Sequence, residues 1–214
     1  VSAGEMVVQL LAFKKYVAPE LHSIVLMGTG EPLLNYANVI RFLHMIHEKD
    51  TFYLGYRNIT VSTSGIVPKM YDLAEEGLPI TLATSLHAPT DGMRRCIMPI
   101  TNKYPIADII KAADNYFEKT GRKITYEYIL IKNLNCNMSC ARQLVQLLGG
   151  KNILINAIPI NDNYDVGLYR PSADEMETFT AYLQKNGINV TLRREMGSNI
   201  QAACGQLRIK REKI

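Results

Sequence analysis

Six short apolar segments, each rich in β-branched or aromatic residues, alternate along this chain with stretches of helical periodicity. Short apolar runs of this kind are typical of strands that are buried on both faces. They cover residues 23–27, 58–62, 80–85, 124–131, 153–159 and 189–193. Because helices separate the strands, we expect a largely parallel sheet with right-handed crossovers. The pattern predicts an α/β fold, either a doubly wound sheet or most of a barrel, and periodicity alone favours neither.

Capping residues mark several of the expected helices. Ser2 with Glu5, and Ser172 with Glu175, have the spacing of a capping box, in which each side chain accepts a hydrogen bond from the other residue's backbone N–H. A further helix is expected over residues 105–119, because it starts with a proline and is followed by a glycine. These signals set the limits of helices between the predicted strands.

Composition is that of a globular protein. The chain is 47% hydrophobic and 21% charged, and no apolar run approaches the roughly 20 residues that a membrane span needs. No linker or repeat divides it, so one domain over residues 1–214 is expected. Lacking a signal peptide, and with four cysteines that form no evident disulfide framework, it is expected to be cytoplasmic with reduced thiols. A net charge of +4 permits a nucleic-acid partner without requiring one.

Unusual polar residues follow the predicted strands at the point where each strand ends. Residues 28–32 (GTGEP) follow the first strand, 62–65 (STSG) end the second and 85–87 (SLH) end the third, while Asn161 follows the fifth. In a parallel α/β fold these ends share one face, where ligand sites are built. A carboxylate, hydroxyls, an imidazole and an amide are therefore expected to converge on one pocket, which suits a zwitterionic ligand that carries a ribose.

Each of these motifs also has an ordinary structural interpretation. The GTGEP segment is compatible with a tight turn, and Thr63 to Gly65 with a cap on the following helix. His87 is compatible with a satisfied, partly buried histidine, and Asn161 with turn chemistry. Taken singly, each motif favours the structural interpretation. Their coincidence on one predicted face favours a binding site.

These motifs and two others resemble those of a known family. They are residues 27–35 (MGTGEPLLN), 61–65 (VSTSG), 85–89 (SLHAP), 98–100 (MPI), 158–161 (IPIN) and 202–207 (AACGQL). In this order the chain resembles the adenosine-C2 methyltransferases of ribosomal and transfer RNA, which are radical S-adenosylmethionine (SAM) enzymes. The resemblance implies a partial (β/α)6 barrel of the radical SAM type.

The resemblance also implies roles for single residues. Gly30 and Glu31 resemble the pair that holds the amino end of SAM, and a carboxylate is a sensible acceptor for an ammonium group. Cys204 matches the cysteine that carries a methyl group during turnover. The other implied SAM contacts are Ser62, Ser85, Leu86, His87 and Asn161.

The chain departs from the family at its N-terminus. It starts without Met inside an expected helix start, and the Cys-x3-Cys-x2-Cys loop that binds a 4Fe–4S cluster is absent, as are the family's first strand and N-terminal RNA-binding region. We therefore expect a barrel that is incomplete at its N-terminus, inactive as an isolated fragment, and prone to pairing at the exposed sheet edge. Cys136 and Cys140 have a similar spacing, but residue 143 is Gln, so we interpret them as helix-start and core residues, and no metal ligand is assigned.

The chemistry implied by the resemblance explains these parts. Carbon C2 of adenine is electron-poor and does not attack the methyl group of SAM, so a cysteine thiolate first accepts it. The reduced cluster then cleaves a second SAM to a 5′-deoxyadenosyl radical, which activates the methyl-thioether on Cys204. A second cysteine, unassigned here, releases the product. Implied partners are ribosomal or transfer RNA, whose base must be flipped out, and an electron donor such as flavodoxin.

Basic residues that are suited to RNA phosphates are equally compatible with a solvated surface. They are Lys151, Arg170, Arg193, Arg194 and residues 208–211.

Other functions remain open. Relatives that methylate C8 of adenine share several motifs, although residues 31–33 and 64–65 resemble the C2 type more closely. A non-catalytic barrel that binds SAM or RNA also fits a chain without a cluster loop. A metabolic aldolase is disfavoured, because no lysine suited to a Schiff base stands at a strand end.

Overall fold

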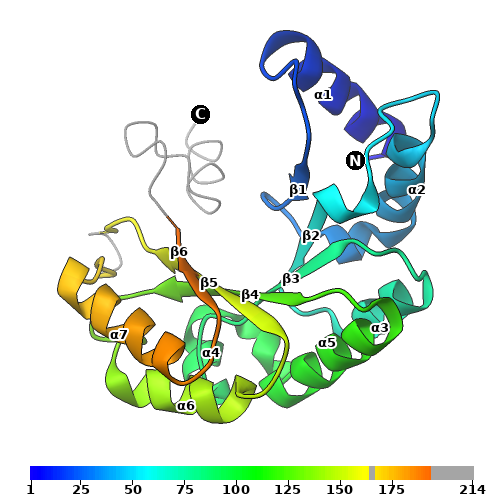
Figure 1. Ribbon diagram of the computed structural model, residues 1–214. Helices are drawn as coiled ribbons and strands as arrows, with labels where there is room; N and C mark the ends of the chain where they lie inside the picture. The colour runs from blue at the N-terminus through cyan, green and yellow to red at the C-terminus, as the bar shows by residue number, and fades with distance from the viewer. Residues whose placement is uncertain (164–166, 194–214) are drawn as a thin grey trace.

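A single parallel sheet forms the centre of the protein in the computed structural model, which describes residues 1–163 and 167–193 (Figure 1). The six strands are hydrogen-bonded in sequence order, from β1 to β6. They are β1 (Ile24–Leu26), β2 (Ile59–Thr63), β3 (Thr81–Ser85), β4 (Ile124–Leu130), β5 (Ile153–Pro159) and β6 (Val190–Leu192). A doubly wound sheet reverses its strand order at a switch point, whereas this order is that of a barrel wall. The α/β prediction is confirmed, and the partial barrel replaces the doubly wound alternative.

Helices α3 to α7 lie on one side of the curved sheet, and α1 and α2 lie beside its β1 end (Figure 1). The helices are α1 (Ala3–Tyr16), α2 (Tyr36–His47), α3 (Val67–Glu75), α4 (Asp91–Ile97), α5 (Ile106–Thr120), α6 (Met138–Leu148) and α7 (Ala173–Lys185). Three 3-10 helices are η1 (Pro32–Asn35), η2 (Tyr56–Asn58) and η3 (Pro99–Asn102). In the described residues no helix is long and apolar enough to span a bilayer.

The expected helix signals are present as hydrogen bonds. The Ser2 hydroxyl accepts from Glu5 N, and the Glu5 carboxylate accepts from Ser2 N at 2.7 Å. Ser172 and Glu175 make the same pair at the start of α7. Gly121 ends α5 with a φ of 67°, which glycine adopts without steric cost. Local sequence therefore determines these helix ends.

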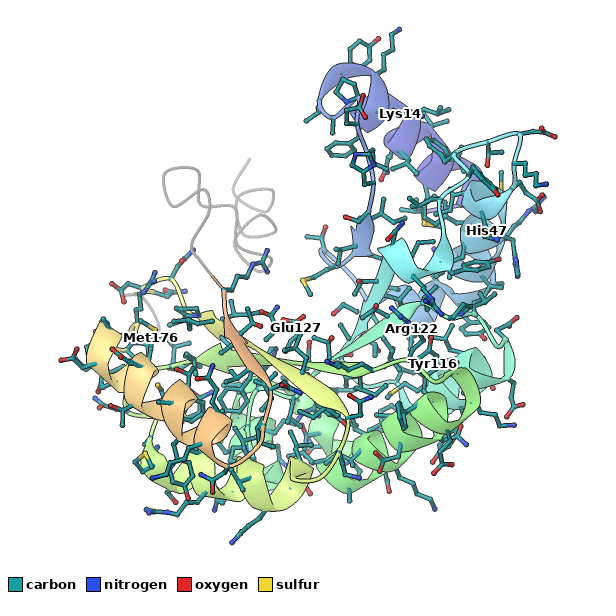
Figure 2. The ribbon with its side chains drawn as sticks, in the orientation of Figure 1. Lys14, His47, Tyr116, Arg122, Glu127 and Met176 are labelled. Atoms are coloured by element: carbon teal, nitrogen blue, oxygen red, sulfur yellow. The ribbon has the colours of Figure 1, made fainter. Side chains whose placement is uncertain are left out.

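Strand β4 shows how the sheet divides apolar from polar side chains. Tyr126 and Tyr128 have no exposed surface, and the Tyr128 ring stacks on Phe179 of α7 with ring centroids 5.7 Å apart. Successive strand residues point to opposite faces, so Glu127 lies on the face away from the helices, as Figure 2 shows. The helix side is the hydrophobic core, and polar groups gather on the other side and at the strand ends.

Candidate functional site: a rim at the ends of four strands

The seven predicted SAM contacts that the structure describes lie at or near the C-terminal ends of their strands. Gly30 and Glu31 follow β1, Ser62 is next to last in β2, and Ser85 is the last residue of β3. The remaining contacts are Leu86 and His87, directly after β3, and Asn161, just after β5. Since the strands are parallel, these residues share one edge of the sheet, as the sequence predicted. Cys204 lies outside the described residues.

The carboxylate of Glu31 links the end of β1 to the end of β2. One oxygen accepts a hydrogen bond from Leu33 N at 3.0 Å. The other accepts from both the backbone N and the hydroxyl of Ser64, each at 2.7 Å. These bonds fix the direction of the carboxylate while its remaining lone pairs stay available to a cationic ligand.

The glycine-rich turn and the Thr-Ser-Gly turn both have structural roles as well. Gly30 has a φ of 137°, which side-chain-bearing residues rarely adopt, so the turn before Glu31 needs glycine there. The Thr63 hydroxyl accepts hydrogen bonds from Gly65 N and Ile66 N, just before α3. The capping interpretation is wrong for Thr63, because both donors precede α3 and no side-chain hydrogen bond caps that helix. Thr63 instead stabilises the turn before α3, and the neighbouring Ser64 donates to Glu31.

His87 is a neutral hydrogen-bonding group in a strained backbone position. Burial, with a smaller effect from the positive charge of Arg94, lowers the pKa of His87 to about 4. Its Nδ1 atom lies 3.1 Å from Ile129 N and accepts that hydrogen bond, so the proton of the neutral ring is on Nε2. The residue has a φ of 60°, in the left-handed region. The imidazole can therefore offer one N–H donor to a ligand near neutral pH.

Two buried side chains that the sequence analysis missed hold this edge together. Arg94 of α4 donates to the carbonyl oxygens of Ser64, Ser85 and Leu86. Asn135 donates to His87 O at 2.8 Å and to Ile129 O at 2.6 Å. Its amide oxygen accepts from Ile131 N at 2.7 Å. We call the hydrogen-bonded set Glu31, Ser64, Arg94, Ser85, Leu86, His87 and Asn135 the rim network.

A row of polar residues extends from Ser85 of the rim network across the predicted ligand face of the sheet. Ser85, Glu127 and Asn156 are register partners on β3, β4 and β5. Asn156 Nδ2 donates to a Glu127 carboxylate oxygen at 2.9 Å. Burial raises the pKa of Glu127, and the hydrogen bond from Asn156 and the charge of Arg193 oppose that rise.

A cavity of about 570 Å³ lies beside this edge rather than over all of it. It is bounded by α1, β1, the GTGEP turn and α2, and its walls are mainly apolar, with Leu10, Phe13 and Phe42 among them. Of the predicted SAM contacts it touches Gly30 and Glu31. Glu31 therefore borders both the cavity and the rim network.

The described cysteines do not fit an iron–sulfur cluster. Cys136 and Cys140 are buried at the start of α6, where the Asn137 side chain accepts from Cys140 N as the helix cap. Burial raises the pKa of Cys136 to about 12, which disfavours the thiolate that a cluster needs. Cys96 is exposed on α4, away from them in sequence. The interpretation of Cys136 and Cys140 as helix-start and core residues agrees with this geometry.

The fold is a parallel barrel wall with polar groups at the ends of its strands. Comparison with known proteins assigns the family. The model of the Radical SAM superfamily matches residues 5–138, so the chain belongs to that superfamily. A crystal structure of a radical SAM methyltransferase from Sphaerobacter thermophilus is similar, with a TM-score of 0.92 and 40% identity. That similarity covers 96% of this chain and 61% of the other.

Curated relatives are named in the same terms. The chain is 49% identical over 205 residues to a protein of Lachnoclostridium phytofermentans named probable dual-specificity RNA methyltransferase RlmN. It is 49% identical over 210 residues to a protein of the same name from Symbiobacterium thermophilum. These matches cover 96% and 97% of this chain, but 58% and 57% of the relatives. The predicted resemblance is confirmed, and the chain spans somewhat more than half the length of these relatives.

Proposed function

We propose that residues 1–214 form one SAM-binding domain of an enzyme that methylates C2 of an adenine in ribosomal or transfer RNA. The observation that carries this proposal is the Glu31 carboxylate, held by Leu33 and Ser64 at the same edge as Ser85 and His87. Relatives that are 49% identical are named dual-specificity RNA methyltransferases, which supports an RNA substrate. The enzyme is proposed to be cytoplasmic, where ribosomes and transfer RNA function.

The rim offers a complementary group for each part of SAM. Glu31, beside Gly30, accepts from the ammonium group of the methionine moiety. The hydroxyls of Ser62 and Ser85 suit ribose oxygens, and the neutral imidazole of His87 donates from Nε2. The Leu86 side chain is buried in the core, so its proposed contact with SAM is through its backbone, and Asn161 supplies amide hydrogen bonds from the end of β5. Binding at these groups orients the sulfonium and excludes water from it.

Cys204 is proposed as the methyl acceptor. Its thiolate sulfur forms a bond to the methyl carbon of SAM while the sulfonium carbon–sulfur bond breaks, and S-adenosylhomocysteine leaves. The thiol proton goes to a base before attack, because the thiolate is the nucleophile. Transfer from the methylated cysteine to adenine requires reducing electrons, for which a flavodoxin-like donor is proposed.

The cluster is proposed to require residues other than those of this chain. Iron–sulfur clusters need several cysteine thiolates at one place, and the described cysteines do not provide them. We expect a polypeptide of these 214 residues alone to bind no 4Fe–4S cluster and to transfer no methyl group. Iron and sulfide analysis after anaerobic reconstitution tests this expectation, and a stoichiometric four-iron cluster contradicts it.

Product analysis tests the function. An enzyme of the relatives' full length, loaded with its cluster, is incubated with RNA and SAM carrying a deuterated methyl group, and the nucleosides are separated by mass-detected chromatography. We expect 2-methyladenosine, and none from Cys204→Ala, with Cys96→Ala as the matched cysteine control. Formation of 8-methyladenosine would support the C8 alternative. SAM binding without any methylation of RNA would support a non-catalytic module.

A further inference from the structure

Arg94 is a buried charged side chain that forms no hydrogen bond to a carboxylate among the described residues, although the charge of Asp91 favours its protonated form. It has no exposed surface, although an arginine in a short helix is ordinarily solvated. Its acceptors are all neutral: Leu86 O at 3.1 Å, Thr101 Oγ1 at 2.9 Å, Ser64 O at 2.7 Å and Ser85 O at 2.8 Å. Burying a charge in this way is costly unless the geometry is specific.

The carbonyl acceptors of Arg94 belong to the two strand ends where the proposed SAM contacts lie. Ser64 follows β2, Ser85 is the last residue of β3, and Leu86 comes directly after β3. Ser85 and Leu86 are themselves proposed SAM contacts, and Ser64 holds the Glu31 carboxylate. The single atom Nη2 of Arg94 donates to a carbonyl from each of the two strand ends. The guanidinium is planar with donors at fixed angles, so it sets the separation of these strand ends as a flexible lysine would not.

Ser64 transmits this constraint to Glu31. Its carbonyl accepts from Arg94, while its backbone N and hydroxyl donate to the Glu31 carboxylate. A shift of Ser64 therefore moves the group that is proposed to hold the ammonium of SAM. On the other side, Arg94 holds Ser85 and Leu86, and its charge helps to keep His87 neutral.

We propose that Arg94 is a positioning residue for SAM, which acts through Ser64 on Glu31 and through Ser85 and Leu86 on the ribose side of the site. It does not contact SAM itself. This inference rests on the proposed SAM site. It requires that loss of Arg94 weakens SAM binding by more than the accompanying loss of fold stability explains.

Variants around Arg94 separate positioning from general destabilisation. Arg94→Met removes all four hydrogen bonds, and Arg94→Lys keeps the charge but loses the planar fork. Thr101→Val removes the acceptor of Nη1 together with the hydrogen bond that the Thr101 hydroxyl donates to Met98 O, and Thr101→Ser keeps that hydroxyl as its matched control. Tyr116→Phe is the stability control, because its hydroxyl bonds to Leu78 O and Ile80 O at the start of β3, away from the rim.

SAM affinity is measured by titration calorimetry and KM for SAM on the cluster-loaded enzyme, beside the midpoint of thermal unfolding. We expect Kd to rise about tenfold or more in Arg94→Met and Arg94→Lys, and about threefold in Thr101→Val. Thr101→Ser and Tyr116→Phe should stay within about twofold of wild type, although Tyr116→Phe lowers the unfolding midpoint. KM for RNA should not change.

Four outcomes are decisive. Unchanged SAM affinity in folded Arg94→Met, or affinities that follow the unfolding midpoints including that of Tyr116→Phe, overturn the proposal. If the Arg94 variants do not fold, the Thr101 pair decides, and equal affinities for Thr101→Val and Thr101→Ser overturn it. Wild-type enzyme that fails to bind SAM refutes the proposed function instead, which distinguishes the two failures.

Discussion

Replacing His87 with Asn should remove a specific part of the protein's pH-dependent stability. His87 is neutral when folded because burial lowers its pKa from 6.5 to about 4. Above pH 6.5 the ring is neutral in both the folded and the unfolded chain, so it adds no pH dependence. Below that value the unfolded chain binds a proton that the folded chain resists, so unfolding becomes more favourable as the pH falls to about 4. Stability is therefore fully present above pH 6.5 and is lost between 6.5 and 4.

The size of the effect follows from the pKa difference. Each pKa unit is worth about 1.4 kcal/mol, so the interval from 6.5 to about 4 corresponds to a loss of about 3 kcal/mol. Asn is the appropriate replacement, because its Oδ1 occupies nearly the position of Nδ1 and can accept from Ile129 N. It also tolerates the φ of 60° at this position better than most residues.

The assay is urea unfolding of wild type and His87→Asn at intervals from pH 7.5 to pH 4. We expect the difference in unfolding free energy between the two proteins to change by about 3 kcal/mol across that range. His22→Asn is the matched control, because the His22 side chain is 82% exposed. We expect a plot of its unfolding free energy against pH to be nearly parallel to that of wild type. A His87→Asn curve that is parallel to wild type would refute the conclusion that the buried imidazole resists protonation.

Two further substitutions test the rim network. Ser64→Ala removes the hydrogen bond from the Ser64 hydroxyl to Glu31 and should raise the Kd for SAM about fivefold in titration calorimetry. Ser64→Thr keeps a hydroxyl, and its Kd should stay nearer that of wild type. Equal affinities of the two variants would contradict the role of that bond. Asn135→Ala removes three side-chain hydrogen bonds in a fully buried position and should lower the unfolding free energy by about 3 kcal/mol. Asn137→Ala removes an exposed helix cap and should lower it by about 1 kcal/mol. Equal losses in urea unfolding would count against the rim network as a source of stability.

Structural features that depend on residues close together in the chain could be predicted from the sequence. The two capping boxes and the glycine that ends α5 act within a few residues, so local spacing is sufficient to identify them. The buried strands likewise have their own signal, because each is a short run rich in β-branched and aromatic residues. The two edge strands are shorter than predicted: β1 is Ile24–Leu26 within the predicted 23–27, and β6 is Val190–Leu192 within the predicted 189–193. In β1, Val25 is 56% exposed, so burial does not determine the pattern at this sheet edge. The strand order needed the structure, since a barrel and a doubly wound sheet share the same local periodicity.

The long-range partners of Arg94 and Asn135 could not be predicted, because they are backbone carbonyls distant in sequence. Arg94 bonds to Ser64, which is 30 residues away, and Asn135 bonds to His87, which is 48 residues away. Every residue carries a carbonyl oxygen, so the acceptor leaves no trace in the residue types. Side chains such as Glu31 were identifiable only because their own chemistry is suited to a ligand. A sequence pattern thus indicates the ligand contacts of this rim, but not the groups that support them.

The hydrogen bonds of Glu31 have a consequence for affinity. A carboxylate that rotates freely loses side-chain entropy when it binds an ammonium group, whereas this one is already held by Leu33 and Ser64. Those donors also share its charge, which weakens each bond that the ligand can form. The net gain in affinity for SAM therefore depends on the direction in which the carboxylate points. That direction is correct only if Ser64 lies at the proper distance from β3. Arg94 sets this distance by donating to Ser64 O and Ser85 O. It follows that Ser64→Ala and Arg94→Met in one molecule should weaken SAM binding by less than the product of their separate effects, because both act on the same carboxylate.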